Sequence, residues 1–161
     1  APPAAEPAPA PAPAPEKKAV AKLEARSGST VTGTVTLTEA GDAVKVRIEL
    51  AGATPGDHAV HVHEKGDCSA PDGSSAGSHF NPGGHAHGAP DAGEHHPGDF
   101  GNVTVGPDGT GTKELETSAF KLAGEGVVVS GLAIIVHEKP DDFSQPTGNA
   151  GGRQACGIIA M

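Results

Sequence analysis

Short runs in which apolar and polar residues alternate constrain this chain more than any other feature. Residues 29–38 read STVTGTVTLT and residues 43–50 read AVKVRIEL, so the Val, Ile and Leu side chains of the second run share one face. A period of two predicts half-buried β-strands, and the EAGD sequence between the runs predicts a turn. Similar patterns predict further strands at 59–64, 100–105, 111–117, 131–137 and 156–159. No segment has a helical period, and short strands separated by turns are typical of an antiparallel sandwich or barrel.

The first residues lack the side chains from which a core is built. Residues 1–15, APPAAEPAPAPAPAP, are nearly all Ala and Pro, and Pro lacks the N–H donor that a helix interior or a sheet requires. We expect an extended spacer there, followed at 16–26 by a short charged bridge of at most a helical turn or two. The predicted organisation is a disordered spacer at residues 1–26 and one folded domain at residues 27–161.

Charge and cysteine content restrict the partners and the compartment. The chain carries 20 acidic and 11 basic residues, a net charge of −9, and shows no basic patch, which argues against nucleic acid as a partner. Cys68 and Cys156 are either two buried thiols or one disulfide formed in an oxidising compartment. No run of 18 apolar residues is present, so no transmembrane segment is predicted. The Ala at position 1, where a start Met would stand, suggests either a processed, mature chain or a trimmed sequence. We expect an exported chain, periplasmic or extracellular, for which residues 1–26 would suit a tether to the cell envelope.

Two predicted connections, residues 65–99 and 138–154, are too long for turns, and such loops are usually functional. The chain has nine His, of which seven lie between His61 and His96. His61 and His63 stand two positions apart on a predicted strand, so their side chains point to the same face with Cα atoms about 6.5 Å apart. Two imidazoles so placed can bind one metal ion side by side.

The first long loop supplies three imidazoles and one carboxylate, the donor set of a closed four-coordinate zinc site. These residues are His79, His87, His96 and Asp99. His137 ends a later strand and would complete a nitrogen-rich set with His61, His63 and His79, which suits copper better than calcium or magnesium. The alternative is a His-rich loop that buffers metal without fixed geometry, and we assign His85 and His95 to that class.

An ordered series of motifs then resembles the copper–zinc superoxide dismutase family. The motifs are HVHEKGDC (61–68), SAGSHFNP (75–82), HGAPDAGEHHPGDFGN (87–102), VHEKPDD (136–142) and GNAGGRQACG (148–157). The likeness runs from about Ser29 to Met161 and leaves residues 1–26 outside. It implies an all-β fold, an eight-stranded antiparallel Greek-key barrel with two long functional loops. It also implies copper and zinc as cofactors, and dismutation of superoxide to molecular oxygen and hydrogen peroxide in defence of the cell envelope.

The resemblance assigns a role to each matched position. It implies copper ligands at His61, His63, His79 and His137, and zinc ligands at His79, His87, His96 and Asp99, with the His79 imidazolate bridging both metals. Asp141 would link copper and zinc ligands from behind, Arg153 would dock the anionic substrate, and His58 would pack beside the copper ligands. Cys68 and Cys156 would form the family's disulfide.

Other readings of the same chain remain open at this point. A non-catalytic copper or zinc carrier would fit the scaffold, although loss of Arg153 or of a copper ligand would have favoured it. An envelope structural module would use the Ala/Pro arm but not the ligands, and the resemblance also admits a homodimer. Because superoxide and the chain are both negative, encounter must depend on local positive charge, for which Lys65, Lys139 and Arg153 are the candidates. Residues 143–147, FSQPT, contain no Lys, so we expect a weaker salt dependence than a lysine-rich loop would give.

Overall fold

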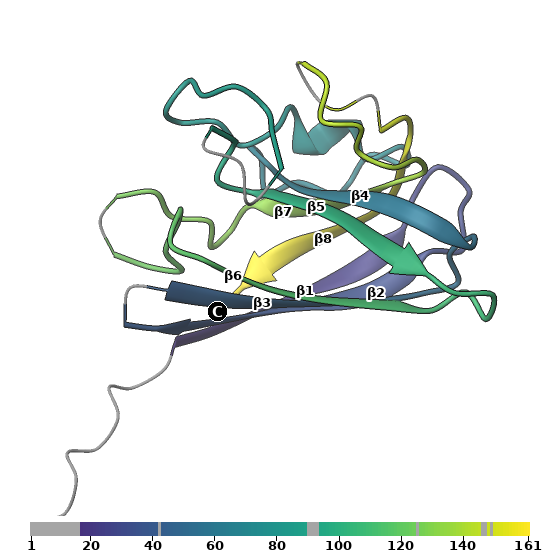
Figure 1. The fold of residues 1–161 in the computed structure, drawn as a ribbon, viewed down its shortest axis with the longest axis horizontal. Helices are drawn as coiled ribbons and strands as arrows, with labels where there is room; N and C mark the ends of the chain where they lie inside the picture. The colour runs from purple at the N-terminus through teal and green to yellow at the C-terminus, as the bar shows by residue number, and fades with distance from the viewer. Residues whose placement is uncertain (1–16, 42, 90–93, 125, 146–147, 149) are drawn as a thin grey trace, which may run out of the picture.

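In a computed structural model of the protein, eight antiparallel strands close into a barrel (Figure 1). The structure describes residues 17–41, 43–89, 94–124, 126–145, 148 and 150–161. The strands are β1 (Lys17–Ala25), β2 (Thr32–Ala40), β3 (Ala43–Ala51), β4 (Gly56–His63), β5 (Asp99–Val105), β6 (Gly111–Thr117), β7 (Ala133–His137) and β8 (Arg153–Ala160). Around the barrel they follow the order β1-β2-β3-β6-β5-β4-β7-β8. The chain order breaks where β3 lies beside β6 and β4 beside β7, which are Greek-key connections, so the predicted fold is confirmed.

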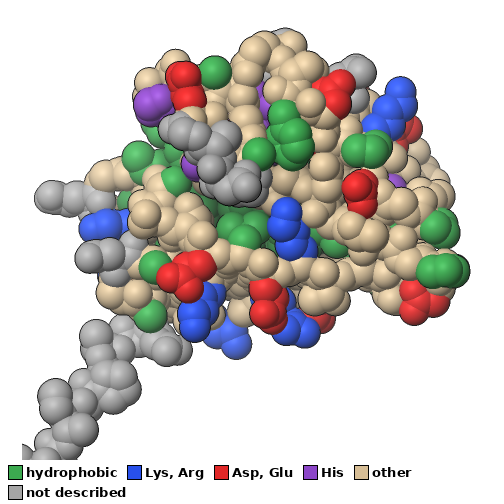
Figure 2. Space-filling view, in the orientation of Figure 1, with side chains coloured by type: hydrophobic (Ala, Val, Ile, Leu, Met, Phe, Trp, Pro, Cys, Tyr) green, Lys and Arg blue, Asp and Glu red, His purple; other side chains and the backbone are tan. Residues whose placement is uncertain are grey.

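The alternating pattern of the sequence is the pattern of burial. On β3, Val44, Val46, Ile48 and Leu50 are buried while Lys45, Arg47 and Glu49 are exposed. On the outer face β3 and β6 place opposite charges side by side, with Lys45 opposite Glu116 and Arg47 opposite Glu114. Figure 2 shows basic and acidic side chains mixed on the face it presents. The barrel interior is therefore filled by one side-chain face of every strand, as a period of two requires.

Strand β1 corrects the expected domain boundary. Residues 17–25, expected to form a bridge with at most a helical turn or two, pair with β2 and with β8, Ala21 lying opposite both Val35 and Ile159. Ala19, Ala21 and Leu23 are buried and the residues between them are exposed. The pattern alternates as it does in β3, but Ala carries little apolar surface and gives a weak signal. The barrel thus begins at Lys17, and only residues 1–16 of the expected spacer lie outside the described residues.

Strands β4 and β7 are buried on both faces, so the side chains on their outer faces are buried outside the barrel core. Val60 and Val62 of β4 face the core, so His61 and His63 face the opposite way, yet both are buried. What covers them is the pair of long connections, β4 to β5 and β7 to β8, which lie together on the upper side of the barrel in Figure 1. The second connection is shorter than expected because Arg153 already belongs to β8.

Cys68 and Cys156 form a disulfide with their Cα atoms 5.7 Å apart, as the resemblance implied. The bond joins the first long connection to β8. The short 3₁₀ turn Ser74–Ala76 follows it in the same connection. Among the described residues, no helix has the length and apolar character needed to cross a membrane.

The place of β1 in the barrel can be tested with neighbouring substitutions. Leu23→Ala removes a buried side chain and should lower the free energy of unfolding by about 2–5 kcal/mol, whereas Lys22→Ala on the exposed face should change it by less than about 0.5 kcal/mol. Urea unfolding of the metal-free, disulfide-bonded chain gives both values. Equal free energies of unfolding for the two variants would show that residues 17–25 do not pack into the barrel and belong to the spacer.

Candidate metal centre

Six histidines and two aspartates from separate parts of the chain meet in one buried cluster. Each is at most 6 % exposed. The members are His61 and His63 of β4, His79, His87 and His96 of the first long connection, Asp99 of β5, His137 of β7 and Asp141 of the second long connection. The rings of His61 and His79 have centroids 4.1 Å apart, and those of His79 and His87 are 5.1 Å apart.

Four of these rings each leave one buried nitrogen without a hydrogen-bond partner, and three of the four, His61 Nδ1, His63 Nε2 and His137 Nε2, belong to a first group; the fourth is His87 Nδ1. The opposite nitrogen of each ring of the first group has an acceptor: Asp141 Oδ2 at 2.7 Å for His61, the Gly77 carbonyl at 2.9 Å for His63 and the Gly151 carbonyl at 3.3 Å for His137. An N–H donated on one side fixes the tautomer and leaves a lone pair on the other, which is how metal-binding histidines are held. With His79, the ligand atoms of this first group all lie within 4.8 Å of one another.

A second group gathers around Asp99. His79 Nδ1 lies 3.2 Å from His96 Nδ1 and 3.7 Å from Asp99 Oδ1, His96 Nδ1 lies 3.5 Å from Asp99 Oδ1, and His87 Nδ1 lies 3.0 Å from Asp99 Oδ2. Four ligand atoms at about 2.0 Å from one zinc ion in a tetrahedron lie about 3.3 Å apart. The donor set and its spacing therefore fit zinc. Ligand atoms of His61, His79, His87 and Asp99 also lie within 4.8 Å of one another, but His61 already belongs to the first group, and the contacts of His96 Nδ1 with His79 and Asp99 place His96 in the second.

The two groups share His79. Its Nδ1 faces the second group, which leaves Nε2 as the nitrogen available to the first. A single imidazole with a nitrogen for each group can therefore join two adjoining metal positions.

Asp141 connects the groups from behind. Its Oδ2 accepts hydrogen bonds from His61 Nε2 at 2.7 Å and from His87 Nε2 at 2.8 Å. Although burial favours the neutral acid, these two hydrogen bonds hold the pKa of Asp141 well below its usual range. Asn102 fixes the backbone of Asp141 on both sides, accepting from its N–H at 2.6 Å and donating to its carbonyl at 3.1 Å.

Burial and charge set the protonation of the rings. Burial lowers the pKa of His63 well below its usual value and that of His137 to about 3, so both rings are neutral at pH 7. Burial opposes charge on His87 as well, but the hydrogen bonds and charges of Asp141 and Asp99 raise its pKa to about 9. A metal ion at His87 Nδ1 must displace a proton, so metal binding in the second group weakens as the pH falls.

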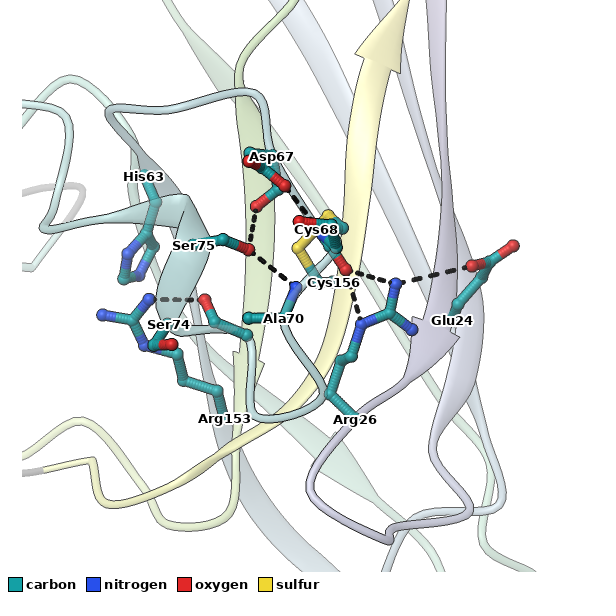
Figure 3. Close-up of a disulfide and its surroundings, with 12 residues drawn as sticks. Glu24, Arg26, His63, Asp67, Cys68, Ala70, Ser74, Ser75, Arg153 and Cys156 are labelled. Carbon is teal, nitrogen blue, oxygen red and sulfur yellow. Dashed lines mark hydrogen bonds and ion pairs between the residues drawn. A yellow bond between two sulfur atoms is a disulfide. The ribbon is translucent and has the colours of Figure 1, made fainter.

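Arg153 lies beside the first group. Its Nη1 donates to the Gly73 carbonyl at 2.8 Å and its Nη2 to the Gly77 carbonyl at 2.6 Å. The Gly77 carbonyl also accepts from His63, and Figure 3 shows the guanidinium next to the His63 ring. The structure thus brings the predicted docking arginine to the predicted copper ligands.

The remaining histidines lie outside both groups. His85 is exposed, and His95 is half-buried with Nδ1 donating to the His96 carbonyl at 2.7 Å. His58 is buried, with ring nitrogens 2.8 Å from the carbonyls of His137 and Thr54, contacts that suit the packing role expected for it.

Sequence reasoning missed three residues of the second connection. Gln145 holds the backbone of His87 with two hydrogen bonds, accepting from its N–H at 2.9 Å and donating to its carbonyl at 2.6 Å. Phe143, in a left-handed conformation with φ 62, stacks on the His87 ring at 6.5 Å. A Cβ on Gly148 would lie 1.8 Å from Asp141 Oδ1, so the backbone must approach the carboxylate without a side chain. Of these three residues, only Gly148 could have been found from the sequence, because it begins the GNAGGRQACG motif. No spacing marks Phe143 or Gln145.

The barrel, the paired ligand groups and the fixed arginine define a β-barrel metalloprotein with two adjoining metal positions. A sequence model of the copper/zinc superoxide dismutase (SODC) family matches residues 31–159. The chain therefore belongs to this family: it is an oxidoreductase that dismutes superoxide with copper and zinc. Strand β1 lies before the matched residues.

The choice between the adjacent His95 and His96 can be tested directly. His96→Ala removes one of the four ligand atoms of the second group and should lower zinc affinity more than the roughly 10- to 100-fold typical of losing a residue behind a ligand. His95→Ala, the matched control, should retain the affinity of the parent chain. Competition with a chromophoric chelator at pH 7 measures both, and the reverse order of affinities would move the ligand to His95.

Proposed function

We propose that His61, His63, His79 and His137 hold copper and that His79, His87, His96 and Asp99 hold zinc. The observation that carries the copper assignment is the three buried nitrogens with no partner, each on a ring whose other nitrogen is hydrogen-bonded. An unpaired buried acceptor costs about 1–3 kcal/mol, and a metal ion at the point they surround removes that cost. Nitrogen ligands favour copper at the first group, and the mixed set with Asp99 favours zinc at the second.

Copper held by the first group would supply a one-electron couple, for oxidation of one superoxide to oxygen and reduction of a second, with two protons, to hydrogen peroxide. The protein holds the anion and supplies a proton. Arg153 uses two of its five N–H donors on Gly73 and Gly77, so the others remain for the anion in a fixed orientation. His79 Nε2, on the side of the first group, is placed to carry one of the two protons that the peroxide needs.

The compartment is part of the same proposal. The Cys68–Cys156 disulfide supports an oxidising location, periplasmic or extracellular, where the enzyme would protect the cell envelope from superoxide. Within this sequence, residues 1–16 are the part of the expected tether that β1, at 17–25, leaves available. A homodimer stays a prediction.

The decisive experiment is superoxide decay catalysed by the copper- and zinc-loaded protein, expressed per bound copper, beside Arg153→Ala. A hydrogen bond to a charged group is worth about 1.5–3 kcal/mol, so the variant should lose roughly 10- to 100-fold in rate. Arg47→Ala removes the same charge from the outer face of β3 and should keep the parent rate. If Arg153→Ala is as fast as the parent at equal copper content, Arg153 does not dock the anion.

Salt should affect this enzyme little. The exposed Lys65 and Lys139 and the half-buried Arg153 are the positive groups that we assign to the entrance, and the net charge of −9 opposes them. We expect kcat/KM to change by less than about threefold between roughly 0.01 and 0.15 M ionic strength. Stopped-flow rates at constant pH test this, and a steep fall with salt would show stronger attraction than these residues provide.

A further inference from the structure

We propose that Arg26, at the end of β1, is a positioning residue for Arg153, acting through the loop that carries the disulfide. The inference rests on the proposed docking role of Arg153 and extends it to a part of the chain that precedes the family match. "Disulfide loop" here means residues 67–77, and "β1–β2 turn" means residues 26–29.

The side chain of Arg26 is hydrogen-bonded to the disulfide loop at one carbonyl, that of Cys68. Its Nε and Nη2 donate to the Cys68 carbonyl at 2.8 and 2.6 Å, and Nη1 donates to the Ala25 carbonyl at 2.9 Å. Glu24 lies 3.6 Å from Nη2 on the strand side, and the Arg26 side chain is only 17 % exposed. All three guanidinium nitrogens thus have partners, and the fork is fixed in direction.

The β1–β2 turn makes further hydrogen bonds, both to Gln154 of β8 and to the disulfide loop. Arg26 N–H donates to the Gln154 carbonyl at 2.8 Å, and Ser29 Oγ donates to the same carbonyl at 2.5 Å. Ser27 N–H donates to the Pro71 carbonyl at 2.7 Å. The turn therefore holds the residue next to Arg153 and the disulfide loop at the same time.

The disulfide loop transmits this hold because it is fixed internally. Ser75 Oγ donates to the Asp67 carbonyl at 2.9 Å and accepts from Ala70 N–H at 3.0 Å, which ties the two ends of the loop together. Figure 3 shows Arg26 and Arg153 on opposite sides of this loop.

The far end of the loop carries the two carbonyls, of Gly73 and Gly77, that hold the Arg153 guanidinium. Gly73 also lies against the arginine side chain, since a Cβ there would be 3.2 Å from Arg153 Cβ.

The disulfide fixes only one point in the first half of the loop, at Cys68. The far end is held where the Ala76 carbonyl accepts from Lys65 N–H at 3.0 Å and the Gly77 carbonyl accepts from His63. The attachments at the Cys68 and Pro71 carbonyls restrict the movement of the part between, which carries Gly73.

Without Arg26, water replaces the fork at the Cys68 carbonyl, and the Gly73 carbonyl loses its fixed separation from β8, while the Gly77 carbonyl stays hydrogen-bonded to His63 Nδ1. The anion site then loses its orientation while the metal ligands, on β4, β5, β7 and the rest of the first connection, keep theirs.

The test uses the disulfide-bonded protein loaded with copper and zinc, and compares Arg26→Met and Arg26→Lys with Arg47→Met. Arg47 contacts Glu49 and Glu114 on the outer face and matches the loss of charge. Two quantities are measured: kcat/KM per bound copper, and the affinity for azide, a probe anion, from the change in the copper visible spectrum. We expect both Arg26 variants to lose about three- to tenfold in each at unchanged metal content, and Arg47→Met to lose neither.

A double substitution separates positioning from other effects. In an Arg153→Ala background, Arg26→Met should lower neither quantity further, because residues that act as a unit are not additive. A further loss of the same size in that background overturns the inference. Parent-like values for Arg26→Lys also overturn it, because they would show that Arg26 acts by charge.

Two results keep this proposal distinct from the one it rests on. If Arg153→Ala has the parent rate, the docking role fails and the inference falls with it. If Arg153→Ala is slow while both Arg26 variants are fast, only the inference is wrong. Should Arg26→Met lose metal, Ser29→Ala, which removes the hydroxyl bond to Gln154, is the milder variant, and parent-like azide affinity in Ser29→Ala and Arg26→Lys together would reject the inference.

Discussion

The carboxylate of Asp141 is the point on which the rest of the centre depends. Its Oδ2 accepts hydrogen bonds from His61 of β4 and from His87 of the first long connection. One carboxylate therefore fixes the tautomers of two ligands in different groups. The same carboxylate accepts from the Phe143 N–H at 2.8 Å, and Gly148 leaves room for it. The fold of the second connection and the orientation of the ligands therefore depend on the same carboxylate.

The barrel supplies the rigid part of that arrangement. Alternate residues of β4 and β7 fill its interior, so His61, His63 and His137 are carried on the outer face by strands whose other face is locked in the core. The two long connections then seal the outer face. Strand β1 completes the closure on the far side by joining β2 to β8. A precise metal site thus stands on a scaffold held by ordinary apolar packing.

Strands and ligands differ in how far the sequence reveals them. The strands formed by the runs rich in Val, Ile and Leu were predicted correctly, because apolar runs bounded by turns can be recognised in the sequence alone. Strand β1 was missed since Ala19 and Ala21 alternate with too little apolar contrast. The pairing of Cys68 with Cys156 came from resemblance and is confirmed, while the assignment of each ligand to copper or zinc stays a prediction. Asn102, Gln145 and Arg26 act through backbone atoms of residues far away in the chain, 39, 58 and 42 positions from Asp141, His87 and Cys68, and no local pattern encodes such contacts.

One carbonyl oxygen, that of Gly77, accepts from both His63 Nδ1 and Arg153 Nη2. Gly77 itself stands at φ 75, in the left-handed region that favours glycine. The same carbonyl therefore positions both His63, the proposed copper ligand, and Arg153, the proposed docking residue. A change that shifts this peptide moves both together, whereas the Gly73 carbonyl holds Arg153 alone, so a change at Gly73 would turn the guanidinium without moving the His63 ring.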